Sequence, residues 1–266
     1  MPAIEIEGLR VDFLLRRRRV VAVDGIGLSL DHGEVLGLLG ESGSGKSVTL
    51  RAILGLLPPR RAIVRGRIKT LGVEVLSADE RTLRALRGAK AAMVFQEPMT
   101  ALDPVYSIGH QIMEPIVVHE GVTWDTARQR ARELLEQVQI PSPERRLDAY
   151  PHELSGGLRQ RAMIAIALAC KPRVLLADEP TTALDATVQI QILLLLRELQ
   201  KELGMAMIMV THDVGVAAEV ADRIAVMHRG LIVEQGDAAD VLKQPQHAYT
   251  RSLLQATLRP DTYPQY

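Results

Sequence analysis

The chain has 266 residues, 47% of them hydrophobic, which is enough to bury the core of one large domain. Its 32 basic and 32 acidic residues give no net charge, whereas an electrostatic grip on nucleic acid needs clustered basic surface. We therefore expect no nucleic-acid partner. Cys170 is the only cysteine, which excludes an internal disulfide and any metal site built on several cysteine thiolates.

The sequence also argues against a membrane span. The longest uninterrupted apolar run, residues 162–170, covers about half of the roughly 20 residues that a spanning helix needs. The N-terminal residues show neither the basic nor the apolar region of a secretory signal. We expect the chain inside the cell, with any association with a membrane coming through a partner protein.

The first strands are predicted from alternation. Apolar and polar residues alternate over residues 4–13 and 21–30, which is typical of antiparallel strands, and the arginines at 16–19 are expected at a solvated hairpin tip. Residues 35–39 are continuously apolar, as in a strand buried on both faces. After a glycine-rich loop, residues 48–57 predict a helix that stops at a pair of prolines.

The rest of the chain predicts an α/β core with a helical insertion. Residues 64–76 look sheet-like, 93–95 predict a short buried strand, and apolar spacings of three and four favour helices over 98–171. Further expected elements are a buried strand at 174–177, a helix at 188–203, a buried strand at 205–210 and a hairpin at 224–233 before short helices. Strands alternating with helices indicate a parallel sheet.

The glycine-rich loop carries the first chemical motif. It reads Gly40-Glu41-Ser42-Gly43-Ser44-Gly45-Lys46-Ser47 and fits the phosphate-binding pattern G-x-x-x-x-G-K-[ST] between a strand and a helix. The glycines let backbone N–H groups point at phosphate oxygens, and the helix that follows adds its positive end. We expect Lys46 to neutralise the β and γ phosphates of a nucleotide and Ser47 to ligate Mg²⁺.

Two adjacent acids follow the predicted strand at 174–177. Asp178 closes the strand, where its carboxylate would meet a Mg²⁺ ion held by Ser47. Glu179 is the candidate general base that polarises the attacking water. A helix cap explains one acid after a strand, but not Asp-Glu-Pro about 130 residues after a phosphate loop.

Two more polar residues follow predicted strands. His212 comes after the strand at 205–210, and the carboxyl ends of parallel strands share one edge, so His212 is expected near the γ-phosphate. Gln96 follows the strand at 93–95 and is expected to meet Mg²⁺ and the attacking water through its amide oxygen. Alone, either residue would more readily be structural.

The tetrapeptide Leu154-Ser155-Gly156-Gly157 is the most specific feature. Ser155 can cap the following helix, and Gly156 and Gly157 leave its first N–H groups open to an anion. With these residues the sequence resembles the ATP-binding subunits of ABC transporters, whose defining motif this is. In that family the anion is the γ-phosphate of ATP bound by the opposite subunit. Leu158 departs from the pattern, since many members have Gln there.

The resemblance implies two further site residues. Ala183-Leu184-Asp185 is similar to the D-loop, which touches the other subunit. Members also stack an aromatic residue on the adenine, and Phe13 is the only aromatic residue before the phosphate loop. One of the arginines at 16–19 is the alternative.

Three longer runs resemble the subfamily that imports dipeptides, oligopeptides or nickel. They are residues 40–48, 95–104 and 249–254. The implied fold is a P-loop NTPase of the ABC ATPase type, with a parallel sheet, an N-terminal antiparallel β-subdomain and an inserted α-helical subdomain. The expected division of the single domain is a nucleotide-binding core at about 1–96 and 172–235, a helical subdomain at about 97–171 and a C-terminal tail at 236–266.

By this resemblance the chain is an ATPase that energises an importer for peptides or a related small solute such as nickel, from the cytoplasmic side of the membrane. Its implied partners are membrane-spanning permease subunits, a second ATP-binding subunit that is identical or homologous, and indirectly a solute-binding protein. The alternative is a soluble ABC ATPase that acts on ribosomes or DNA. The zero net charge counts against that alternative.

Overall fold

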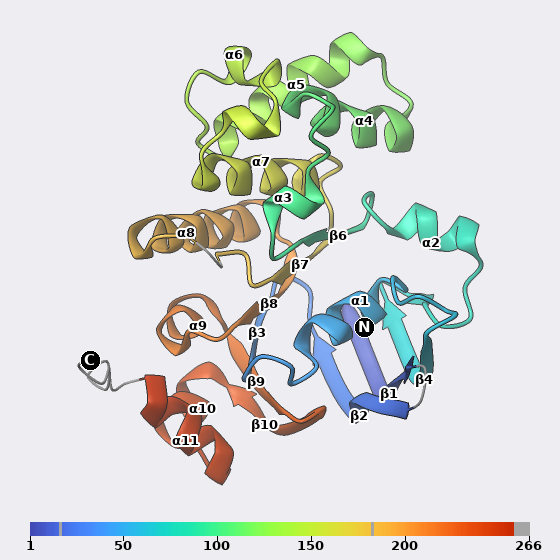
Figure 1. The fold of residues 1–266 in the computed structure, drawn as a ribbon, viewed down its shortest axis with the longest axis vertical. Coiled ribbons are helices and arrows are strands. Elements are labelled where there is room, and N and C mark those ends of the chain that lie inside the picture. The colour runs from blue at the N-terminus through green and yellow to red at the C-terminus, as the bar shows by residue number, and fades with distance from the viewer. Residues whose placement is uncertain (16–17, 182–183, 258–266) are drawn as a thin grey trace.

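The computed structural model describes residues 1–15, 18–181 and 184–257 (Figure 1). Figure 1 shows three parts: a small sheet formed by N-terminal strands, a second sheet through the middle, and a layer of helices at the top. Within the described residues, no helix combines the length and the hydrophobicity needed to cross a membrane.

The N-terminal sheet is antiparallel, as the alternation predicts. Its strands lie in the order β2-β1-β4-β5, with β1 at Ile4–Leu15, β2 at Arg18–Leu30, β4 at Ala62–Thr70 and β5 at Val73–Glu74. On β2, the buried residues Val23, Ile26, Leu28 and Leu30 are separated by more exposed ones. One face of this sheet therefore contributes to the core.

The predicted hairpin tip is only partly correct. Arg18 and Arg19 belong to β2, and Arg19 forms an ion pair with Asp12, a fully buried carboxylate on β1. Arg16 and Arg17 lie outside the described residues. Arg18 and Arg19 extend the strand by pairing with Leu15 and Leu14 of β1, and the ion pair with Arg19 helps to compensate the buried charge of Asp12.

The second sheet holds the predicted buried strands. Its order is β10-β9-β3-β8-β7-β6, with β3 at Val35–Leu39, β6 at Ala91–Val94, β7 at Val174–Asp178, β8 at Ala206–Thr211, β9 at Arg223–His228 and β10 at Leu231–Asp237. The strands from β9 to β6 run parallel to their neighbours, and β10 pairs antiparallel with β9. Every residue of β3 and β8 is buried, which explains their continuously apolar sequence.

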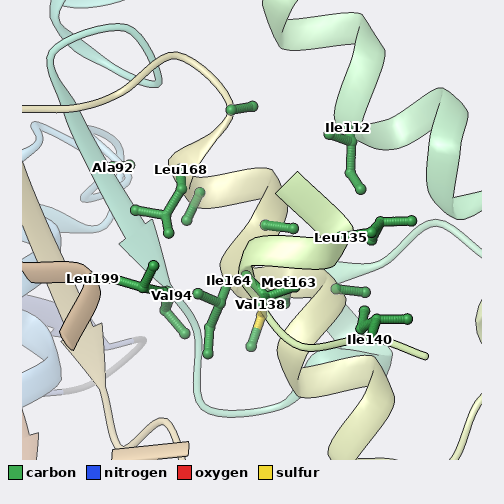
Figure 2. Packing of buried hydrophobic residues seen from close by; sticks show 14 of the residues in the cluster. Ala92, Val94, Ile112, Leu135, Val138, Ile140, Met163, Ile164, Leu168 and Leu199 are labelled. Atoms are coloured by element: carbon green, nitrogen blue, oxygen red, sulfur yellow. The ribbon is translucent and has the colours of Figure 1, made fainter. Parts of the chain in front are cut away.

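The helices between β6 and β7 form the upper layer in Figure 1. They are α3 (Pro98–Ala101), α4 (Ile108–Glu120), α5 (Trp124–Gln137), α6 (Pro143–Leu147), the 3₁₀ turn η1 (Pro151–Glu153) and α7 (Gly156–Leu168). Figure 2 shows Ile164 of α7 beside Val94 of β6, with Ile112 of α4 and Leu135 of α5 on the other side of the same buried cluster. The insertion thus packs directly on the sheet.

The remaining helices flank the sheets. They are α1 (Lys46–Ile53), α2 (Glu80–Leu86), α8 (Ala186–Leu203), α9 (Val214–Val220), α10 (Ala238–Lys243) and α11 (Ala248–Thr257). Helix α1 begins two residues before the predicted start and ends four before the predicted end. It starts early because the carbonyl of Gly45, in the left-handed conformation, accepts the N–H of Thr49 at 2.9 Å.

The predicted fold class is confirmed: a parallel sheet, an antiparallel N-terminal sheet and an inserted layer of helices. In the parallel sheet the carboxyl ends of β3, β6, β7 and β8 share one edge. The polar residues that follow these strands are brought together there.

Candidate active site

The phosphate loop is packed too tightly for side chains at two of its glycines. Gly40 has a φ of 151°, and a Cβ at this position would lie 2.2 Å from the carbonyl oxygen of Met227 on β9. Gly45 has a φ of 109°, and its Cβ would lie 2.5 Å from the carbonyl oxygen of Ala22. These contacts hold the loop between the two sheets, so both glycines are required by the fold.

Lys46 is folded back into the loop. Its Nζ donates hydrogen bonds to the carbonyl oxygens of Gly40 at 2.7 Å and Glu41 at 2.9 Å. Burial lowers the pKa of this ammonium, while the carboxylates of Glu179, Asp178 and Glu41 oppose the shift. The loop therefore encloses a buried cation that is held by two backbone carbonyls and has carboxylates nearby.

The loop also holds an orphaned polar atom. Ser44 Oγ is buried and has no hydrogen-bond partner within the described part of the chain. A cavity of ≈ 160 Å³ opens beside it and is lined by Ala22, Ser42, Gly43, Gly45, Lys46, Ser47, Val48, Gln96 and Glu179. Ser44 itself does not line the cavity, but the lining residues of the loop and of the start of α1 offer backbone N–H groups and the Lys46 cation, so this arrangement fits an anion that accepts hydrogen bonds from the loop.

Ser47 and Asp178 meet at the edge of the sheet. Ser47, in the first turn of α1, donates a hydrogen bond through Oγ to Asp178 Oδ1 at 2.7 Å. Asp178 is the last residue of β7 and is 2% exposed. Burial raises the pKa of its carboxyl group, and the hydrogen bond from Ser47 partly offsets this shift.

Glu179 is the centre of a cluster drawn from four elements. Its Oε1 lies 3.9 Å from Lys46 Nζ, and its Oε2 accepts a hydrogen bond from Gln96 Nε2 at 3.2 Å. His212 Nδ1 lies 3.5 Å from the same Oε2 atom. Glu179 adopts a φ of 46°, unusual for a residue with a side chain, directly after β7. The strand end thus turns sharply and carries the carboxylate into the mouth of the loop.

The serine-glycine motif occupies the start of α7. Ser155 caps this helix by accepting the N–H of Leu158 at 3.4 Å. Gly156 and Gly157 pack against Leu184 and Val188, at the start of α8. Because a Cβ on Gly157 would lie 2.9 Å from Val188, the second glycine is needed for this contact.

The structure does not bring Ser155 to the phosphate loop of its own chain. The motif does not line the cavity beside the loop, and Figure 1 shows α7 in the helical layer, well apart from α1. Asp185, from the predicted D-loop, caps α8 by accepting the N–H of Val188 at 3.0 Å. Ala183 of that loop lies outside the described residues.

Phe13 does not line the phosphate cavity. It lies on β1 opposite Val20 and is partly buried against the core of the N-terminal sheet. The residue of this sheet that lines the cavity is Ala22. No sequence signal singles out Ala22, because a methyl group carries no chemistry that a motif could specify.

Comparisons with known proteins give a consistent result. Residues 23–182 match the family model described as ABC transporter. The chain is 49% identical over 256 residues to the dipeptide transport ATP-binding protein DppD of Escherichia coli (strain K12), covering 96% of this chain and 78% of that protein. It is 48% identical over 256 residues to DppD of Haemophilus influenzae, with the same coverage of 96% and 78%.

Solved structures agree with the sequence comparison. A dimeric ATP-binding cassette in a post-hydrolysis state, bound to ADP and Pi, superposes with a TM-score of 0.79 at 29% identity, covering 88% of this chain and 98% of that one. The cbiO1 subunit of Clostridium perfringens, part of an ABC transporter complex, superposes with a TM-score of 0.76 at 30% identity, covering 91% of each chain.

Proposed function

This chain belongs to the ABC transporter family, and from that premise we propose that it is the ATP-hydrolysing subunit of an importer for peptides. The observation that carries the proposal is the cluster of Glu179 with Lys46, Gln96 and His212 at the mouth of the phosphate loop. A carboxylate beside a phosphate-binding lysine is suited to accept a proton from water that attacks the γ-phosphate. The relatives named as dipeptide transport proteins suggest the solute class.

ATP and Mg²⁺ suit the groups present. The triphosphate would accept hydrogen bonds from the loop N–H groups, and Lys46 would turn from the loop carbonyls to the phosphates. Ser47 Oγ and Asp178 Oδ1 are adjacent oxygen donors of the kind that Mg²⁺ prefers, and Gln96 supplies a third oxygen. When bound, Mg²⁺ neutralises charge that develops on the phosphates.

Glu179, Gln96 and His212 have separate roles in the hydrolysis step. Glu179 takes the proton of the attacking water, because its carboxylate is held between Gln96 and His212. Gln96 orients the water, and His212 contacts the γ-phosphate from the end of β8.

A second ATP-binding subunit would complete the site. The first N–H groups of α7 lack partners within the helix, and Ser155, Gly156 and Gly157 present that end away from their own loop. We assign them to the γ-phosphate bound by the partner, with Asp185 at the same interface. The dimeric cassette among the similar structures supports this arrangement.

The permease would dock in an apolar cavity of ≈ 250 Å³ between the helical layer and the nucleotide site. Its lining includes Leu56, Phe95, Ala101 and Met163. Leu56 and Phe95 are 40% and 37% exposed, so an apolar segment of another chain can cover them. Since Phe95 directly precedes Gln96, a permease segment bound here could shift the backbone at Phe95 and so change the position of Gln96.

In the helical region, the exposure of one side chain differs from the expectation based on the sequence. The sequence suggests that Tyr106, His110 and His119 are all exposed. His110 is half-buried, because its ring stacks on Tyr106 at 4.8 Å and on Trp124 at 5.3 Å. Tyr106 is 48% exposed, so it remains available for a contact with the permease.

Cysteine crosslinking tests the docking surface. A cysteine replacing Val105, which is 70% exposed, is expected to crosslink to a cytoplasmic loop of the permease. Burial raises the pKa of the native Cys170 to about 11, so that thiol stays protonated and slow to react at neutral pH. Lys243→Cys on α10 is the matched exposed control. Crosslinks found only from residues 240–257 would contradict the assignment.

The adenine contact is tested by replacing Phe13 with Leu, which keeps an apolar side chain but removes the ring. Stacking of an aromatic ring on a base contributes about 1–3 kcal/mol, so ATP affinity should fall about 5- to 150-fold. Arg19→Ala tests the alternative. If the Phe13→Leu protein binds ATP as tightly as the wild type and Arg19→Ala binds ATP more weakly, the adenine contact is assigned to Arg19 instead.

Transport itself is tested in vesicles that contain the whole transporter. Addition of a peptide-loaded solute-binding protein is expected to stimulate ATP hydrolysis by this chain, whereas a Ni²⁺-loaded protein is expected to have no effect. Stimulation by Ni²⁺ alone would reassign the solute. Recovery of the chain with ribosomes or DNA instead of membranes would overturn the proposed function.

A further inference from the structure

The C-terminal helix α11 reaches the phosphate loop through one side chain. Tyr249 Oη accepts the backbone N–H of Glu41 at 3.2 Å, across 208 residues of sequence. The tyrosine ring lies against the imidazole of His228, with ring centroids 3.8 Å apart and planes tilted by 32°. Because His228 ends β9, the hydroxyl is held by both the helix and the parallel sheet.

This hydrogen bond fixes the same peptide group that holds Lys46. The carbonyl of the Gly40–Glu41 peptide accepts Lys46 Nζ at 2.7 Å, and the N–H of that peptide is the group donated to Tyr249. A peptide bonded at both ends cannot rotate without breaking one contact. Tyr249 therefore sets the orientation of the peptide from which Lys46 is held.

Other residues of the C-terminal part support the loop from the same side. Gly230, in the turn after β9, donates its N–H to the carbonyl of Ser44 at 2.9 Å, and the carbonyl of Met227 packs on Gly40. Helix α11 is itself anchored, because Glu234 accepts the N–H of His247 at 3.0 Å. Leu254 of α11 belongs to the same buried cluster as Leu39, the residue before the loop.

We propose that Tyr249 is a positioning residue of the phosphate loop, and that ATP affinity depends through it on the docking of α11. The inference rests on the proposed ATPase function. The backbone N–H groups that Tyr249 helps to position bind phosphate in the ground state and the transition state alike, so loss of the hydroxyl weakens both equally. Uniform weakening raises KM and leaves kcat unchanged.

Tyr249→Phe keeps the ring and its contact with His228 and removes the hydroxyl. Loss of one neutral hydrogen bond corresponds to an increase in KM for ATP of about three- to ten-fold, with a matching loss in ATP affinity by titration calorimetry. The value of kcat should stay within about two-fold. Tyr150→Phe is the matched control, because Tyr150 also lies against a histidine, His152, but in the helical layer.

Each result separates the inference from the proposed function. Unchanged KM and affinity in Tyr249→Phe, with normal ATP binding by the wild type, would overturn the inference alone. A lower melting temperature with an equal fall in kcat would assign a merely structural role and also overturn it. Absence of ATP binding by the wild type would overturn both. An equal increase in KM for Tyr150→Phe would show that the effect is not specific to the loop contact.

Discussion

Glu179→Gln is expected to slow ATP hydrolysis about 100-fold or more while ATP binding survives. Glutamine has nearly the same shape and can still contact Gln96 and His212, but its amide cannot take a proton from the attacking water. The phosphate loop is unchanged and Lys46 keeps its hydrogen bonds to the loop carbonyls, so affinity for ATP should stay near the wild-type value. The measurement is single-turnover phosphate release beside titration calorimetry with ATP.

The control for this variant is Glu198→Gln, which neutralises an exposed carboxylate on α8. Its hydrolysis rate should match the wild type. If Glu179→Gln itself retains near-normal hydrolysis, Glu179 is not the base. Activation of the water would then be assigned to Gln96 and His212 acting together.

Lys46→Ala is expected to reduce both ATP affinity and turnover. The variant removes a buried cation that is 4% exposed and that is hydrogen-bonded inside the phosphate loop. A hydrogen bond to a charged group contributes about 1.5–3 kcal/mol, so affinity for ATP should fall about 10- to 150-fold. Turnover at saturating ATP should fall as well, because the same cation stabilises charge that develops on the phosphates.

Lys243→Ala provides the control, since it removes an exposed cation from α10 without touching the loop. Titration calorimetry should give the wild-type affinity for this protein. Unchanged ATP binding in Lys46→Ala would mean that the glycine-rich loop is not the nucleotide site.

The buried strands were the most predictable part of the fold. Residues 35–39 form β3 with the predicted bounds, because a parallel strand covered on both faces must be continuously apolar. The arginine run was less predictable, since Arg18 and Arg19 pair with the end of β1 and Arg19 forms an ion pair with the buried Asp12. A tertiary ion pair of this kind leaves no local signal in the sequence.

In the candidate site, too, some residues have a local sequence signal and others are placed only by tertiary packing. Lys46, Asp178 and Glu179 lie in short motifs whose spacing is fixed by the strand ends they follow, so their chemistry can be predicted from the sequence. Tyr249 contacts the loop across 208 residues, and only the packing of α11 on the sheet brings it there. Motifs identify reacting groups, whereas the groups that hold them in place depend on long-range packing.

The central claim is that ATP is hydrolysed in a site that two chains complete together. Native mass spectrometry of Glu179→Gln with Mg²⁺-free ATP, alone and with the coexpressed transporter, tests it most directly. We predict a stable pair of ATP-binding subunits that carries two ATP molecules and is lost when Ser155 is also replaced by Arg. ATP bound to separate chains at saturating concentration in both preparations would contradict the account.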